Sequence, residues 1–237
     1  MPDNKILGTS VIWNSEQTTS PSRFPEVPWA MPVAKDHEAI HGDWYWEYSA
    51  DHLHQVDDAE QIRDHLLRAI FGASSNAKRD PENATVKLKW VAFVGGKRES
   101  RRLMGDYIYT MQDATEHREF PDTVVEETRA LDGHYQRADT GSPYDFLSHA
   151  MFLRLDAPYF IPFRCFYSRN IANLMMAGRC FSCSHVGLSG PRVMRTCAQM
   201  GVATGYAAVV CKRRGALPRE VGQQHIAELR NLIGYES

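Results

Sequence analysis

The spacing of apolar positions predicts a helix over Asp57–Phe71, the first clear element of the chain. One apolar residue recurs every four positions, as on one side of a helix: Ile62, Leu66 and Ile70. Asp58 and Gln61 resemble a capping box at its start, and Gly72 can end it. Before this helix the chain is rich in proline and tryptophan, so we expect irregular structure there.

Two strands are expected after that helix. Alternating apolar residues predict one over Val86–Val94, which Gly95 and Gly96 would end. Leu174–Ala177 is a short continuous apolar run, which is typical of a strand buried on both faces. The chain therefore reads as a compact α/β unit from Ile171 onward.

Two helices are expected in the last part of the chain. The first begins near Val193 and continues toward Arg213, and the second, amphipathic helix covers Glu220–Ile233. Small residues leave one face of the first helix bare, so that a sheet or helix can approach it closely: Gly201, Gly205 and Ala208. These elements together predict an α/β fold class, with an α+β part followed by a strand–helix unit.

Composition narrows the class of protein. The 237 residues are 43% hydrophobic and 24% charged, which is typical of a soluble globular chain. A net charge of −2 gives no basic surface for nucleic acid or an anionic membrane. The longest uncharged apolar stretch, Ala198–Cys211, is shorter than the roughly 20 residues of a membrane helix. Five cysteines and a start without signal-peptide features favour a cytoplasmic location.

One motif would fit a zinc hydrolase. His37, Glu38 and His41 form an HExxH pattern, in which two imidazoles bind zinc and the glutamate acts as general base. Pro32 and Gly42 flank it closely, so a helix here would have about two turns. The alternative is a polar loop in which the spacing is coincidental, and we predict no metal.

Two further patterns have both a functional and a structural interpretation. Cys180 and Cys183 form a CxxC pair, which suits a redox pair or half of a zinc site but also two small core residues. Lys97–Arg102 is a basic run directly after a double glycine. It is either a solvated face or a loop that binds an anion, for which arginine is well suited.

The start of the long helix is a candidate ligand site. Its N-terminus, near Arg192–Met194, would direct unpaired N–H groups at a ligand above the preceding strand. The anionic edge of a reduced flavin suits such donors, and a phosphate suits them equally.

Several segments form an ordered series along most of the chain. The C-terminal ones are Phe160–Cys165, Asn173–Cys180, Ser184–Leu188, Arg192–Met194 and Thr196–Gly201, and the earlier ones are Pro28–Ala30, Gly42–Glu47, Gly96–Arg102 and Gly105–Tyr107. In this order they resemble the FAD-dependent oxidoreductase family, with its glutathione-reductase-like, two-domain architecture. The C-terminal series resembles the closing segment of the family's Rossmann-like FAD domain.

The resemblance implies roles for residues of this chain. The expected catalytic residues are His185, Arg98, Glu99 and Arg101, which would hold a small organic substrate while FAD accepts a hydride. The expected cofactor-binding residues are Gly178, Arg179, Cys180, Arg192, Val193, Met194 and Thr196.

The resemblance also implies a division of the chain. We expect a substrate-binding portion over residues 1–160 and a C-terminal segment of the FAD domain over residues 161–237. None of the sixteen glycines forms the Gly-x-Gly-x-x-Gly turn that seats the pyrophosphate. The chain is therefore expected to be the C-terminal portion of the enzyme, completed by a missing N-terminal half or by a partner chain. The alternative is a non-catalytic subunit that docks on a separate FAD-binding chain.

Overall fold

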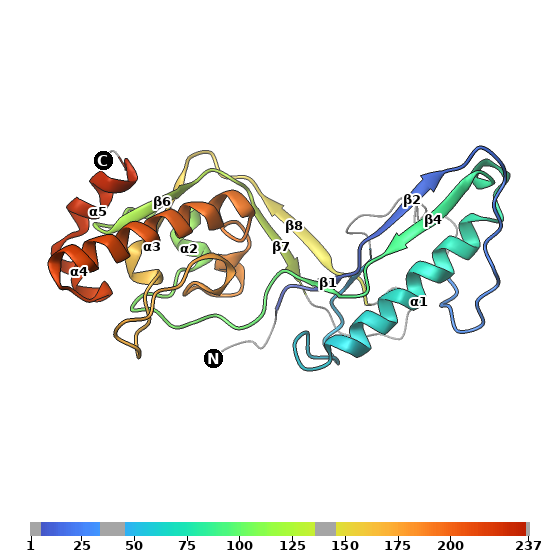
Figure 1. Cartoon of the computed structure of the whole chain (residues 1–237), viewed down its shortest axis with the longest axis horizontal. Coiled ribbons are helices and arrows are strands. Elements are labelled where there is room, and N and C mark those ends of the chain that lie inside the picture. The colour runs from blue at the N-terminus through green and yellow to red at the C-terminus, as the bar shows by residue number, and fades with distance from the viewer. Residues whose placement is uncertain (1–5, 34–45, 136–145, 236–237) are drawn as a thin grey trace. The chain divides into compact units, whose positions relative to one another are not determined.

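The computed structural model describes residues 6–33, 46–135 and 146–235 (Figure 1). The chain divides into two compact units, each built from two segments. Unit 1 comprises Met1–Arg98 and His134–His149, and unit 2 comprises Glu99–Gly133 and Ala150–Ser237. The expected domains have a single boundary, at residue 160, whereas each of the two observed units combines two separate segments of the chain. The assignment of a substrate domain and an FAD domain therefore stays a prediction.

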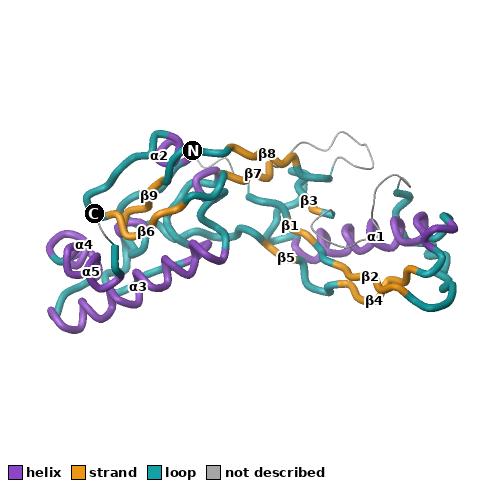
Figure 2. Tube along the Cα trace, turned by 90° about the horizontal axis from the view of Figure 1, so that it is seen from above, coloured by secondary structure: helices purple, strands orange, loops and turns teal. Residues whose placement is uncertain are grey.

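Unit 1 is built on a long helix and two small antiparallel sheets. Helix α1 spans Ala59–Ala77 and runs beside the ribbon of β2 (Trp13–Gln17) and β4 (Val86–Val91) (Figures 1 and 2). The other sheet has the strand order β3-β1-β5, with bounds Glu47–Tyr48, Thr9–Ser10 and Gly96–Lys97. The short 3₁₀ helix η1 spans Pro81–Asn83. Large side chains from these elements form the core, among them Trp13, Trp46, Tyr48, Leu66 and Ile70.

Unit 2 packs helices against a two-stranded antiparallel sheet. Its strands are β6 (Thr123–Glu127) and β9 (Tyr159–Pro162). Its helices are α2 (Met111–Thr115), α3 (Met194–Arg214), α4 (Pro218–Gln224) and α5 (Ile226–Ile233), and its 3₁₀ helices are η2 (Phe163–Cys165), η3 (Gly178–Cys180) and η4 (Val186–Leu188). Strands β7 (Leu131–Tyr135) and β8 (His149–Leu153) pair with each other, and the division between the units falls within both.

The helices and small antiparallel sheets confirm the α/β class. The helix expected over Asp57–Phe71 is confirmed but continues through Gly72 to Ala77. Gly72 serves close packing instead of ending the helix, because a Cβ atom there would lie 1.7 Å from the carbonyl oxygen of Met31. The long helix near Val193 is confirmed as α3, and the last expected helix is two helices that meet at His225.

The buried strand expected over Leu174–Ala177 is wrong. This segment forms no strand, and within the part of the chain that the structure describes it makes one bridge, between Met175 and Tyr167. It leads directly into η3 at Gly178. The strand of Val86–Val94 is shorter than expected and ends at Val91. No helix in the described part of the chain is both long enough and apolar enough to cross a membrane.

Candidate functional site

A buried acid–imidazole pair lies in unit 2. The Nδ1 atom of His185 is 2.8 Å from Oε2 of Glu99, and the two side chains are only 5% and 0% exposed. Arg102 forms an ion pair with the other oxygen of the Glu99 carboxylate. An ionised carboxylate only accepts hydrogen bonds, so His185 donates from Nδ1. In the neutral imidazole Nε2 is then the nitrogen that can accept a proton.

Backbone hydrogen bonds bring these two residues together across 86 positions of sequence. The amide of Leu103 donates to the carbonyl of Cys180 at 2.9 Å, and that of Tyr109 donates to the carbonyl of Ser182 at 3.0 Å. The amide of Ser184 in turn donates to the Tyr109 carbonyl at 2.8 Å. The segment after Glu99 therefore runs beside the segment that carries the CxxC pair and His185.

The start of α3 keeps backbone donors available. Its N-cap residue, Val193, has no side chain that can cap the helix. In the described part of the chain the amides of Met194, Arg195 and Thr196 have no acceptor, as expected for a first helical turn. The Met194 side chain is 90% exposed, so this turn is open on that side. The helix therefore presents N–H groups and the positive end of its dipole.

The short helix η3 lies against this first turn. Gly178, its first residue, has a φ of 78°, in the left-handed region that favours glycine. A Cβ atom on Gly178 would lie 3.9 Å from both Cβ and Sγ of Cys197 in α3. The structure thus brings together Gly178–Cys180 and the start of α3, which the family resemblance implies as parts of one cofactor site.

Two carboxylates also accept hydrogen bonds from side chains at the start of α3. Arg192 Nη2 lies 2.9 Å from Oδ2 of Asp132, and both side chains are largely buried. The Thr196 hydroxyl donates to one oxygen of Glu127, and the other oxygen accepts from the amides of Thr128 and Arg129 at 2.8 Å. The charge of Arg192 is therefore already neutralised within unit 2. Sequence reasoning missed Asp132 and Glu127, because they lie in a polar stretch with no motif.

The predicted catalytic arginines are placed differently from His185. Arg98 belongs to unit 1, where Nη1 lies 3.0 Å from Glu47 and donates to the carbonyl of Gly8 and the hydroxyl of Ser10. The division between the units falls directly after it. Arg101 belongs to unit 2 and is exposed. The structure therefore unites His185 with Glu99 but gives Arg98 its own carboxylate partner.

The cysteines are free thiols in this structure. Burial raises the pKa of Cys165 and Cys183 well above the usual value, which disfavours the reactive thiolate. Cys180 is only half-buried. The described residues contain no group of three or more side chains able to hold a metal ion. The HExxH residues His37, Glu38 and His41 lie outside the described ranges.

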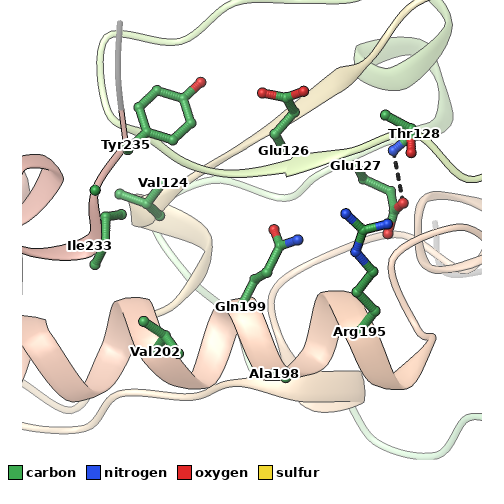
Figure 3. Close-up of a pocket in the computed structure, with 11 residues that line it drawn as sticks. Val124, Glu126, Glu127, Thr128, Arg195, Ala198, Gln199, Val202, Ile233 and Tyr235 are labelled. Atoms are coloured by element: carbon green, nitrogen blue, oxygen red, sulfur yellow. Dashed lines mark hydrogen bonds between the residues drawn. The ribbon is translucent and has the colours of Figure 1, made fainter.

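A pocket of about 480 Å³ opens between β6 and α3 (Figure 3). Arg195 and Gln199 extend from α3 toward β6, and Val124 and Tyr235 line the opposite end. None of the residues expected at the site lines this pocket. Sequence reasoning missed it, because it depends on how β6 and the C-terminal segment pack on α3.

Comparison with known proteins identifies a protein family that the chain matches. A family model described as FAD dependent oxidoreductase matches residues 8–233. No curated protein and no solved structure matches the chain.

Proposed function

Because the chain belongs to the FAD dependent oxidoreductase family, we propose that it oxidises a small organic substrate by hydride transfer. FAD, when bound, supplies the two-electron acceptor for this oxidation. The observation that carries the proposal in this chain is the buried Glu99–His185 pair. His185 lies in the segment that leads into the open first turn of α3.

His185 is proposed to take the proton that such an oxidation releases. Removing a hydride from a carbon that bears an O–H or N–H group also frees a proton, which needs a base. The imidazole accepts it at Nε2, because Nδ1 already donates to Glu99. Glu99 is a positioning residue that fixes the tautomer and stabilises the imidazolium, and Arg102 pairs with the other oxygen of the Glu99 carboxylate.

The first turn of α3 is proposed to hold the electron-rich edge of the flavin ring. Its free N–H groups, from Met194 to Thr196, are donors of the kind that this edge accepts. Gly178 keeps a side chain away from the same turn, Arg179 and Cys180 follow it in η3, and Val193 is the N-cap residue of α3. These residues fit the cofactor. Arg192 would support this turn indirectly, because its charge is balanced by the carboxylate of Asp132.

The ADP half of FAD is proposed to be held by residues that are not among these 237. None of the glycines forms the Gly-x-Gly-x-x-Gly turn that seats a pyrophosphate. A further dinucleotide-binding unit, on the same protein or on a partner chain, would supply it. The exposed face of α3 supports such docking, because a Cβ atom on Gly201 or Gly205 would meet nothing within 4 Å.

Titration with two flavins tests the ring site on α3 and the external ADP site separately. The 237-residue chain is titrated with FAD and with riboflavin, and quenching of flavin fluorescence gives each dissociation constant. We expect weak binding with similar constants for both, since only the ring has a site on this chain. Much tighter binding of FAD would overturn the external ADP site. Binding of neither flavin at millimolar concentration would overturn the ring site on α3.

A further inference from the structure

Two half-exposed cysteines lie in the two elements η3 and α3, which pack against each other. Cys180 ends η3, and Cys197 lies in the first turn of α3. Cys165 and Cys183 are buried in the same unit, so a reagent from solution reaches them less readily. Cys211 is also half-exposed, but it lies near the other end of α3. Cys180 and Cys197 are therefore the two accessible thiols at this junction.

Both sulfurs lie close to the start of η3, and Cys197 Sγ also lies 3.4 Å from the carbonyl oxygen of Arg192. Cys197 Sγ lies 3.9 Å from the position of a Cβ atom on Gly178, the first residue of η3. Cys180 Sγ lies 3.4 Å from the carbonyl oxygen of Ala177, the residue directly before Gly178. The Cys180 side chain thus folds back toward the end of η3 that Cys197 contacts.

The electrostatics of Cys197 agree with this geometry. Burial is the main cause that raises the pKa of the Cys197 thiol, the nearby Arg179 guanidinium opposes it, and the negative charge of a Cys180 thiolate adds to it. A charge on Cys180 perturbs Cys197 only because the two groups are close.

We propose that Cys180 and Cys197 form a reversible disulfide that links η3 to the first turn of α3, with a small-molecule disulfide as the oxidant. One thiolate of the pair attacks a sulfur of the oxidant, which forms a mixed disulfide and releases one thiolate. The second cysteine, once deprotonated, attacks the protein sulfur of that mixed disulfide and releases the other thiolate. The two cysteines lose two protons and two electrons, and the oxidant becomes two thiols. This inference does not depend on the proposed flavin site.

The test uses the full chain and oxidised glutathione. After incubation, the protein is quenched in acid, its free thiols are alkylated in denaturant, and it is digested with trypsin for mass spectrometry. We expect the number of alkylated thiols to fall from five to three. We also expect a disulfide between peptides 180–192 and 196–212, with a loss of two hydrogens relative to the reduced peptides.

Serine variants assign the bond, because each of these peptides carries two cysteines. Cys183→Ser and Cys211→Ser should keep the linked peptides, whereas Cys180→Ser and Cys197→Ser should each abolish them. Far-UV circular dichroism establishes that each variant is folded, and the wild-type thiol number does not depend on any variant. Five alkylated thiols in the oxidised wild type would overturn the proposal, as would glutathione adducts on Cys180 or Cys197 without a linkage. Linked peptides that persist in Cys180→Ser or Cys197→Ser would also overturn it.

Discussion

Replacing Arg192 with alanine should destabilise unit 2 markedly. The Arg192 and Asp132 side chains are only 11% and 9% exposed, and Arg192 Nη2 lies 2.9 Å from the Asp132 carboxylate and 3.1 Å from its carbonyl oxygen. Removing one partner of a buried ion pair costs about 3–5 kcal/mol. Arg129 remains 3.4 Å from Asp132 and can balance part of its charge. We therefore expect a loss near the lower end, about 3 kcal/mol.

The assay must report on unit 2 alone. All five tryptophans belong to the sequence of unit 1, so tryptophan fluorescence does not follow the unfolding of unit 2: Trp13, Trp29, Trp44, Trp46 and Trp90. Hydrogen exchange of the β6 and α3 amides, measured by mass spectrometry, reports on unit 2 directly. Arg213→Ala is the matched control, since it removes the same charge from the exposed last turn of α3. Its cost should be about 0.3–1 kcal/mol.

A double-mutant cycle with Asp132→Asn then measures the interaction energy between Arg192 and Asp132. If the two groups stabilise each other, the double variant should lose less stability than the sum of the single variants, by about 1 kcal/mol or more. Two results would refute the reasoning. One is equal protection of the β6 and α3 amides from hydrogen exchange in Arg192→Ala and Arg213→Ala. The other is strict additivity of the stability losses of Arg192→Ala and Asp132→Asn in the double variant.

Three further predictions concern other parts of unit 2. Gly205→Ala should stabilise the isolated chain by about 1 kcal/mol in urea unfolding, since alanine favours the helix and its Cβ atom meets nothing within 4 Å; a loss of stability would contradict the exposed α3 face. A hydrogen bond from Arg219 holds the pKa of Asp106 below its usual value, so the stability from this pair is present above pH ~3.9 and is lost as the pH falls through the lowered pKa. In Arg219→Ala the NMR titration of Asp106 should move up toward the usual value, and an unchanged midpoint would count against the ion pair. Nitrogen-15 NMR of neutral His185 should show the proton on Nδ1, and a proton on Nε2 would contradict the role given to Glu99.

Local signals predicted the two longest helices of this chain, α1 and α3, but not the short helix α2. The periodicity of Ile62, Leu66 and Ile70 is sufficient to place α1, and the long helix expected from near Val193 toward Arg213 corresponds to α3. The prediction that Gly72 ends the helix is wrong. A glycine is needed there because the backbone of Met31, which is distant in sequence, leaves no room for a side chain.

Long-range pairing could not be predicted in the same way. An apolar run such as Leu174–Ala177 becomes a strand only if a neighbour pairs with it, and among the described residues it forms one bridge, to Tyr167. The carboxylates that meet Arg192 and Thr196 lie 60 and 69 positions away in sequence, and no local pattern marks them. Likewise, the contact between Glu99 and His185 depends on hydrogen bonds between two irregular segments.

The central claim, a flavin ring site at the start of α3, is tested most directly by two glycine variants. Gly178 and Gly215 both have positive φ, at 78° and 63°, and they lie by opposite ends of the same helix. Valine at either position introduces comparable backbone strain, but only at Gly178 does the side chain enter the proposed site. Riboflavin titration should show binding at least roughly tenfold weaker in Gly178→Val and nearly unchanged in Gly215→Val, a difference of about 1.4 kcal/mol. Equal affinity in the two variants would contradict the site.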